Sequence, residues 1–229
     1  IYTLSLHDAL PIYQPGKDPM DVALDAVKEA VRRGGDVLFE GDAYSREWHE
    51  EARKRGLIQA GDMPGKIDLL LLPENKKMLE ELGVFHEHEL EALHDIRMEA
   101  FVRSLEIEVA ILYDMLWEGI LPALAKQLIL EKNSLSALDG MEVPEGEPWR
   151  EYILGLGRTR AALIEDAHRL NELRGRMAEL PVRERADFLV GTAIPLMDSI
   201  RKRCDAAEVN MAADIWPYPI SRNLLSLSV

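Results

Sequence analysis

The chain has 229 residues, of which 47% are hydrophobic and 30% charged, and its formal net charge at pH 7 is −14. These proportions are typical of a globular domain, and the negative charge excludes nucleic acid and argues against an anionic membrane as partner, because both need a basic surface. The single cysteine, Cys204, excludes an internal disulfide, and no apolar run is long enough to span a bilayer, so we expect a cytoplasmic protein.

Residues 1–12, IYTLSLHDALPI, are similar at every position to the translation of a sequencing adapter. Such a segment is excluded from fold reasoning, and His7 and Asp8 with it. The alternative is a natural N-terminal strand or tail. Under the adapter interpretation we expect an upstream part of the protein that this sequence lacks.

Residues 13–65 predict two helices and a short strand. Asp18 is expected to cap the first helix, and the proline after it to be the first helical residue. An apolar helix face follows, and two adjacent glycines are expected to end the helix. Residues 37–39, Val-Leu-Phe, predict the strand. Ser45 predicts the cap of the second helix.

Three helical segments are expected next. Two short helices over 66–72 and 74–82 are separated by a proline. A long helix begins near Glu87 and carries apolar residues at helical spacing. Gly119 and Pro122 interrupt this helix and predict a kink.

The last segments predict a helical hairpin. After a loop at 139–148, a helix over 149–179 places apolar residues every seven positions. These are Leu156, Leu163, Leu170 and Met177. A second apolar seam follows Pro181, and a turn this short makes the two helices antiparallel neighbours. The fold class predicted is mainly α, with a helical C-terminal domain built on a long antiparallel hairpin.

Two Glu-x-x-His matches are the sharpest signal for chemistry: Glu91 with His94, and Glu165 with His168. In di-iron carboxylate bundles, two such motifs and two more glutamates project into a helical core. The further glutamates that can be imagined in this set are Glu106, Glu108 and Glu184. Composition alone predicts about 0.7 such pairs by chance, and the first pair lies at a polar helix start. A metal site and a solvated helix surface both fit.

Other candidates also have two interpretations. His86, His88 and His94 form a loose cluster that fits either a metal site or a solvated helix start. Cys204 lies on an apolar stripe, which favours a packed thiol over a nucleophile. Five arginines of the 149–179 helix fit a solvated face or a contact with a partner subunit. They are Arg158, Arg160, Arg169, Arg174 and Arg176.

The sequence Gly155-Leu156-Gly157 lies inside a helical pattern with no strand before it, so it does not predict a nucleotide-binding loop. From the residues alone, we predict no catalytic, cofactor-binding or metal-ligating residue in this chain.

Four stretches carry a resemblance to a known family. They are residues 36–57, DVLFEGDAYSREWHEEARKRGL, residues 99–123, residues 193–206 and Trp216-Pro-Tyr-Pro219. Together they resemble type III glutamine synthetases. The first stretch is similar to a family segment in which a strand ends in Asn-Gly-Asp-Gly-Tyr-Ser and a helix beginning with Trp follows. The second and third resemble the family's long helix and its final helix, and the last resembles its Trp-Pro-(Phe/Tyr)-Pro near the C-terminus. The resemblance runs from about Asp18 to Leu225.

The resemblance implies a glutamate–ammonia ligase of nitrogen metabolism, which makes glutamine with ATP and Mg²⁺ or Mn²⁺ through a γ-glutamyl phosphate and assembles as a double-ring homo-oligomer. The family's metal-binding glutamates, substrate contacts and catalytic arginines belong to motifs upstream of this chain, so no catalytic residue carries over. Two departures exist. Ala43 stands where the family usually has Gly, so the turn there is expected to differ, and residues 220–226 differ from the family's C-terminal pattern.

We therefore expect four parts: adapter-derived residues 1–12, the tail end of the α/β catalytic domain at 13–65, the helical C-terminal domain at 66–214, and an extended tail at 215–229. The hypothesis is a C-terminal fragment with a structural, oligomerising role and no activity alone. The alternatives are a free-standing helical metal-carboxylate protein and a plain helical interaction module. Without the upstream strands, we expect four apolar residues to lack a packing surface. They are Val22, Val27, Val31 and Leu38.

Overall fold

The computed structural model describes residues 16, 18–35, 38–137 and 146–219. Within these ranges the regular secondary structure is helical and no strand is present, which confirms the predicted mainly α class. No helix of the described ranges combines the length and apolar character that a membrane crossing needs. The chain divides into two compact units, one up to Gly61 and one from Asp62 onward, and each is described by itself. The four-part division expected from the sequence stays a prediction, and its residues 1–12 lie outside the described ranges.

The first unit contains helix α2, Pro19–Arg33, and helix α3, Arg46–Lys54. Both predicted caps are present. The Asp18 carboxylate accepts a hydrogen bond from the amide two residues on, at 2.8 Å, and the Ser45 hydroxyl from the amide three residues on, at 3.1 Å. After α3, Gly56 adopts a φ of +73°, the left-handed conformation with which glycine commonly ends a helix.

The strand predicted over 37–39 is wrong for Leu38 and Phe39, which have no regular structure, while Val37 lies outside the described residues. The Leu38 carbonyl accepts a hydrogen bond from Arg55 Nη1 at 2.6 Å. The Phe39 ring packs against Trp48, with ring centroids 4.7 Å apart. A strand needs a neighbouring strand to pair its backbone groups, and the described part of this unit contains none.

Helix α2 keeps most of its apolar face exposed. Val27 and Val31 are 60% and 53% exposed, and Leu38 after the helix is 52% exposed, as expected for residues without a packing surface. The expectation is wrong for Val22, which is 4% exposed. The described contacts give no account of that burial.

The second unit begins with three short elements: α4, Met63–Asp68, a 3₁₀ turn η2, Leu69–Leu71, and α5, Pro73–Glu81. Helix α4 starts earlier than predicted because the Asp62 carboxylate caps it, accepting from the Gly65 amide at 2.8 Å. The predicted break falls where α5 begins at its proline.

The long helix α6, Glu87–Asp114, continues through a π-helical segment η3, Met115–Ile120, into α7, Leu121–Ala137. The interruption predicted at Gly119 and Pro122 therefore takes the form of a widened turn. Proline lacks the N–H that would bond back along the helix, and its ring clashes with the preceding turn, so an inserted π segment relieves both problems.

Helix α8, Gly146–Met177, runs back along α6 and α7, and residues 138–145 before it lie outside the described ranges. The chain then turns into α9, Val182–Phe188, a second π segment η4, Leu189–Ala193, and α10, Ile194–Glu208. Like the first π segment, the second ends two residues before a proline, here at position 195.

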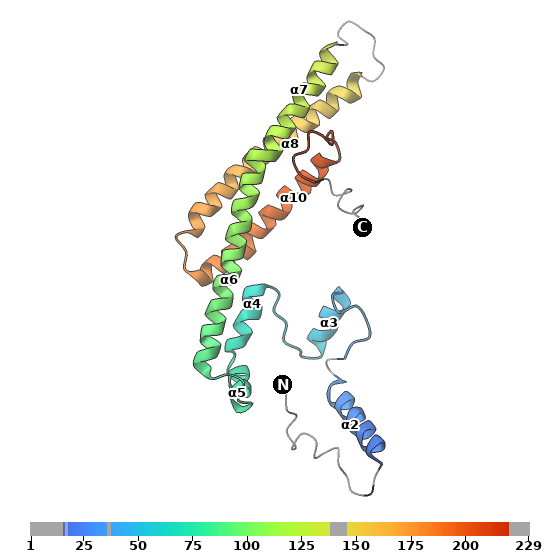
Figure 1. Ribbon diagram of the computed structural model, residues 1–229, viewed down its shortest axis with the longest axis vertical. Helices are drawn as coiled ribbons and strands as arrows, with labels where there is room; N and C mark the ends of the chain where they lie inside the picture. The colour runs from blue at the N-terminus through green and yellow to red at the C-terminus, as the bar shows by residue number, and fades with distance from the viewer. Residues whose placement is uncertain (1–15, 17, 36–37, 138–145, 220–229) are drawn as a thin grey trace. The chain divides into compact units, whose positions relative to one another are not determined.

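The second unit packs three long helical rods around one apolar core (Figure 1). The predicted seam of α8 is buried throughout, with Leu163 and Leu170 completely inaccessible, and α10 contributes Ile200 to the same cluster. The rods α8 and α9–α10 run antiparallel, which confirms the predicted hairpin. The short helices α4 and α5 contact the first part of α6.

Candidate functional site

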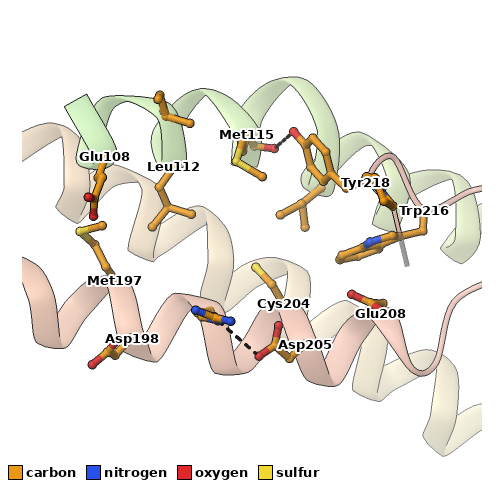
Figure 2. Close-up of a pocket in the computed structure, with 14 residues that line it drawn as sticks. Glu108, Leu112, Met115, Met197, Asp198, Cys204, Asp205, Glu208, Trp216 and Tyr218 are labelled. Atoms are coloured by element: carbon orange, nitrogen blue, oxygen red, sulfur yellow. Dashed lines mark hydrogen bonds and ion pairs between the residues drawn. The ribbon is translucent and has the colours of Figure 1, made fainter. Parts of the chain in front are cut away.

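A groove of about 470 Å³ lies between α6 and α10 (Figure 2). Its walls carry apolar side chains from both helices and from the C-terminal segment. They are Ile111, Leu112, Met115, Ile120, Met197, Cys204, Trp216, Tyr218 and Pro219. The charged residues of its lining are mostly acidic. They are Glu108, Asp198, Asp205, Glu208 and Arg201. Such a groove suits contact with apolar surface beside a positive charge.

The C-terminal segment closes one end of this groove. Trp216 is 9% exposed and belongs to the apolar core. The Tyr218 hydroxyl donates a hydrogen bond to the carbonyl oxygen of Met115 at 3.2 Å, at the start of the first π segment. A methyl group added at Gly119 would lie 2.5 Å from that hydroxyl oxygen. The ring of Tyr218 therefore occupies space that only a glycine at position 119 leaves open.

Cys204 forms part of the groove wall and is 8% exposed. Burial, with a smaller effect of the negative charges of Asp205 and Asp166, raises the pKa of its thiol to about 12. The reactive thiolate is therefore scarce at neutral pH. This geometry supports the packed-thiol interpretation over a nucleophile.

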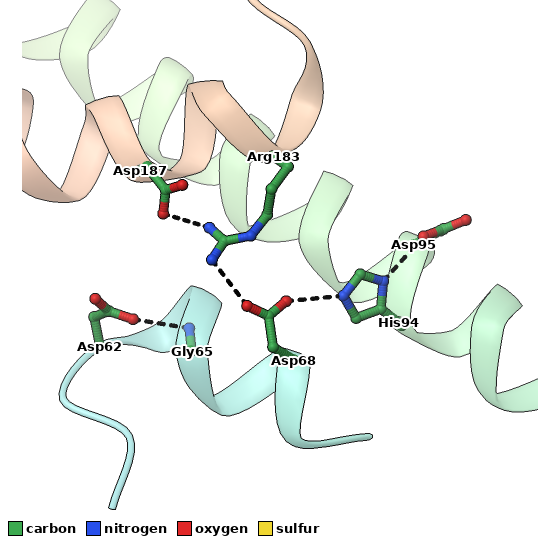
Figure 3. A network of polar contacts seen from close by, with 7 residues as sticks. All are labelled: Asp62, Gly65, Asp68, His94, Asp95, Arg183 and Asp187. Carbon is green, nitrogen blue, oxygen red and sulfur yellow. Dashed lines mark hydrogen bonds and ion pairs between the residues drawn. The ribbon is translucent and has the colours of Figure 1, made fainter. Parts of the chain in front are cut away.

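A polar network joins α4, α6 and α9 (Figure 3). His94 Nε2 lies 3.1 Å from Asp68 Oδ1, and its Nδ1 lies 3.0 Å from Asp95 Oδ1. Arg183 of α9 donates to the other Asp68 oxygen at 2.8 Å and also pairs with Asp187. Burial alone would lower the pKa of His94, but the hydrogen bonds to Asp95 and Asp68 outweigh it and raise that pKa.

A second polar contact lies inside the helical hairpin. Asp166 of α8 is 1% exposed, and its carboxylate accepts a hydrogen bond from Arg203 of α10. Arg169 adds a longer contact at 3.7 Å. A charge this deeply buried requires paired cations, and this ion pair joins α8 to α10.

The two Glu-x-x-His pairs do not meet. His94 lies near the start of α6, whereas the His168 ring packs against Trp117, with centroids 6.0 Å apart. At 1.5 Å per residue, His94 and Trp117 are about 34 Å apart along the helical rod. Glu91 pairs with Lys76, and Glu165 with Arg169. The two motifs therefore cannot share a metal ion, and the alternative of a di-iron-like protein loses its basis.

The remaining candidates are also placed on the surface or in local pairs. The rings of His86 and His88 stack 5.8 Å apart, and both residues are exposed.

The arginines of α8 have intramolecular partners. Arg158 pairs with Glu151, Arg174 lies over the Tyr113 ring, and Arg176 lies over the Phe188 ring. Arg160 reaches the Leu121 carbonyl at 3.4 Å. The Gly155-Leu156-Gly157 sequence lies within α8.

Comparison with known proteins identifies the family. Residues 23–136 match the family model of the glutamine synthetase C-terminal domain. A type-3 glutamine synthetase from Dictyostelium discoideum is 26% identical over 88% of this chain and 28% of its own length. Glutamine synthetases from Bacteroides fragilis and Butyrivibrio fibrisolvens are 25% and 27% identical over 92% of the chain. The chain belongs to the glutamine synthetase family. It spans less than a third of the length of each of these relatives.

The stretches that suggested this family occupy structurally distinct places in the glutamine synthetase domain. Residues 99–123 include most of α6 and the first π segment, and residues 193–206 lie largely in α10. Trp216-Pro-Tyr-Pro219 is the segment that closes the groove between them. At Ala43, where the family usually has Gly, the backbone avoids the left-handed region, because no described non-glycine residue has a positive φ. The turn therefore fits alanine, and its difference from the family's turn stays a prediction.

Several polar contacts of this domain were not predicted from the sequence. Arg183 and Asp187 are four residues apart, a spacing that predicts a helical ion pair. Nothing in the sequence pairs Arg183 with Asp68, which is 115 residues away, or Arg203 with Asp166. The buried Asp166 lies on the apolar side of α8, and that position was the one local signal available.

Proposed function

We propose that this chain is the architectural C-terminal domain of an ATP-dependent glutamate–ammonia ligase, which packs on the catalytic domain and on neighbouring subunits. The family match supports the parent activity. The architectural role is supported by one structural observation above all: residues 62–219 enclose a core of their own that runs from Ile67 to Trp216. A self-contained core allows the domain to act as a rigid support.

The parent enzyme in this proposal works in the cytoplasm as a double-ring homo-oligomer, with ATP and Mg²⁺ or Mn²⁺. The described residues of this chain bring together no group of three or more His, Cys, Asp or Glu side chains fit to hold a metal ion. We assign no metal ligand to this chain, and the absence of ATP-binding and catalytic residues from it stays a prediction.

The test uses the full-length gene from the same source. Its product is compared with a version lacking residues 87–229 and with this 229-residue chain, by an ATP-dependent γ-glutamyl transfer assay and by sedimentation. We expect the full-length protein to be active and oligomeric, the deletion to be smaller and inactive, and this chain to be inactive. An unchanged oligomer with normal activity after the deletion would overturn the architectural role. An inactive, folded full-length protein would overturn the ligase assignment.

Point variants of the full-length protein provide a matched control. Leu163→Asp places a charge at a fully buried position of the domain core, whereas Glu172→Gln changes a charge on the exposed face of the same helix. We expect the first to reproduce the deletion and the second to behave as wild type. Equal behaviour of both variants would show that the fold of this domain does not matter to the assembly.

A further inference from the structure

Three isoleucines of α6 point away from the core. Ile96 is 64% exposed, Ile107 53% and Ile111 51%. They lie 11 and 4 residues apart, so at 100° per residue they fall within about 60° of one another on the helix. Along this stretch the opposite side of α6 holds its buried residues. These are Met98, Val102, Leu105 and Val109.

These side chains lie along one outward stripe about 22 Å long. Ala100 is also exposed and lies on the same stripe, between Ile96 and Ile107. Ile111 belongs to the lining of the groove between α6 and α10, so the stripe ends at that groove. Single exposed apolar residues are ordinary, but an ordered row of isoleucines on one helix face is typical of a surface that another protein covers.

The stripe is self-complementary when two copies of α6 run antiparallel. With a two-fold axis beside Arg103 and Ser104, Ile96 lies opposite Ile111 of the partner subunit. In the same register Ala100 lies opposite Ile107 of the partner subunit. Large side chains thus meet large ones at the ends, and a small residue faces a large one between them. An isologous interface needs this kind of match, because one surface patch must fit itself.

The charges beside the stripe favour the same register. Arg97 and Glu108 lie on one flank, and both are exposed. In the antiparallel pairing each Arg97 faces Glu108 of the partner subunit, twice across the two-fold axis. A parallel pairing would instead put Arg97 and Glu108 of the partner subunit on opposite flanks and about 16 Å apart along the helix axis, so the ion pair would not form. On the other flank, Arg103 has Glu99 one turn away on its own helix.

We propose that the outward face of α6 is the contact through which two copies of this chain pair antiparallel, with Ile96, Ile107 and Ile111 buried between them and Arg97 paired to Glu108 of the partner subunit. The proposal names a partner surface for the architectural role and rests on that role, but not on ligase activity. It is therefore tested on the 229-residue chain itself.

The first experiment is a charge-reversal cycle followed by sedimentation equilibrium over a range of protein concentrations. We expect wild type to show a concentration-dependent dimer, and Arg97→Glu and Glu108→Arg each to raise its dissociation constant about 10-fold. The double variant should return to within about 3-fold of wild type, because it restores the pair in reverse. Glu172→Arg on α8 and Lys202→Glu on α10 are exposed controls with the same charge changes and should leave the constant unchanged.

The second experiment locates the two-fold axis. Ser104→Cys places a thiol next to its own copy in the proposed register, so mild oxidation should give a disulfide-linked dimer on a non-reducing gel. Ser136→Cys, an exposed position on α7, should not cross-link. The buried Cys204 contributes little background, because its pKa is raised to about 12.

Three outcomes would overturn the proposal: a wild-type chain that stays monomeric at concentrations on the order of 100 µM, a dimer indifferent to the α6 variants, or a charge reversal that the double variant does not rescue. A folded monomer would mean that a different part of the parent enzyme covers the stripe. That result would leave the architectural role itself to the deletion experiment, so the two failures are distinguishable. Circular dichroism of each variant confirms that the helices are intact.

Discussion

The hydroxyl of Tyr218 donates to the carbonyl oxygen of Met115, 103 residues earlier in the chain, at 3.2 Å. Met115 begins the π-helical turn, where the regular backbone bonding of the helix is interrupted. Burial, together with the negative charge of Glu118 and the nearby Cys204, raises the pKa of Tyr218, so the phenol keeps the proton that it donates. One side chain thus ties the C-terminal segment to the interrupted helix.

Tyr218→Phe removes this hydrogen bond and keeps the ring. We expect the free energy of unfolding of the second unit to fall by about 1 kcal/mol, the usual contribution of such a bond. Urea unfolding followed by circular dichroism measures it. Tyr44→Phe is the matched control, because Tyr44 is 94% exposed and should change nothing. Equal stability of both variants would show that the Tyr218 hydrogen bond contributes nothing.

Gly119→Ala should destabilise the protein by about 1–3 kcal/mol, although alanine favours helices more than glycine does. The added Cβ would lie 2.5 Å from the Tyr218 hydroxyl oxygen and force that ring out of its place. Gly175→Ala on α8 is the control, since a Cβ there meets nothing within 4 Å. We expect the control to be stabilising by about 1 kcal/mol.

In the Tyr218→Ala background, Gly119→Ala should lose most of its cost, because the clashing ring is gone. A double-mutant cycle in urea measures this coupling. Additive effects of the two substitutions would mean that Tyr218 does not occupy the space above Gly119.

The His94 network predicts a pH-dependent stability. Because the hydrogen bonds to Asp95 and Asp68 raise the pKa of His94 in the folded state, the contact stabilises the fold fully below the unfolded pKa of about 6.5 and less as pH rises through the folded pKa. The stability difference between wild type and His94→Gln should therefore shrink between pH 6 and pH 8. Urea unfolding at a series of pH values measures it.

The matched variant for this pH series is Asp68→Asn, which keeps the shape of the side chain and removes the carboxylate charge that faces His94 and Arg183. In that background the pH dependence caused by His94 should be weaker. A stability difference between wild type and His94→Gln that grows with pH would contradict the proposed role of the His94 network. So would a pH dependence that Asp68→Asn leaves unchanged.

Removing either partner of the buried Asp166–Arg203 ion pair should destabilise the fold, but by different amounts. Arg203→Met leaves the Asp166 carboxylate buried with only the longer Arg169 contact, and we expect a loss of about 3 kcal/mol. Asp166→Asn should cost less, because Arg203 is 40% exposed on its side chain and can turn to water. Thermal or urea unfolding of both variants measures the order, and the reverse order would show that the pair is not governed by burial of the carboxylate.

The burial of Cys204 predicts that its thiol reacts slowly. Since its thiol is buried and its pKa is raised to about 12, the native protein at pH 7–8 should react with a disulfide reagent far more slowly than the unfolded protein. Absorbance of the released thiolate, with and without denaturant, measures the ratio. Fast reaction of the native chain would indicate that the groove wall opens readily.

Much of the fold could be predicted because its signals are local. Asp18 and Ser45 mark helix starts, and Pro73 marks a break between helices, through hydrogen bonds or steric clashes within one turn of chain. The two caps and the break were found where expected. The seam of α8 is a repeat of apolar residues within one helix. The strand prediction at Leu38 was wrong because a strand needs a neighbouring strand to pair with, and the described residues contain none.

The sequence by itself determined the helical class, the antiparallel hairpin and the family, since periodicity, caps and short motifs depend on neighbouring residues. Only the tertiary structure decided that the two Glu-x-x-His pairs lie far apart, that Asp68 joins His94 to Arg183, and that Tyr218 fills the space above Gly119. It also decided which face of α6 stays outside the core. Each of these depends on contacts between residues distant in the chain, whose pairing is set by how the helices pack against one another and not by any local pattern.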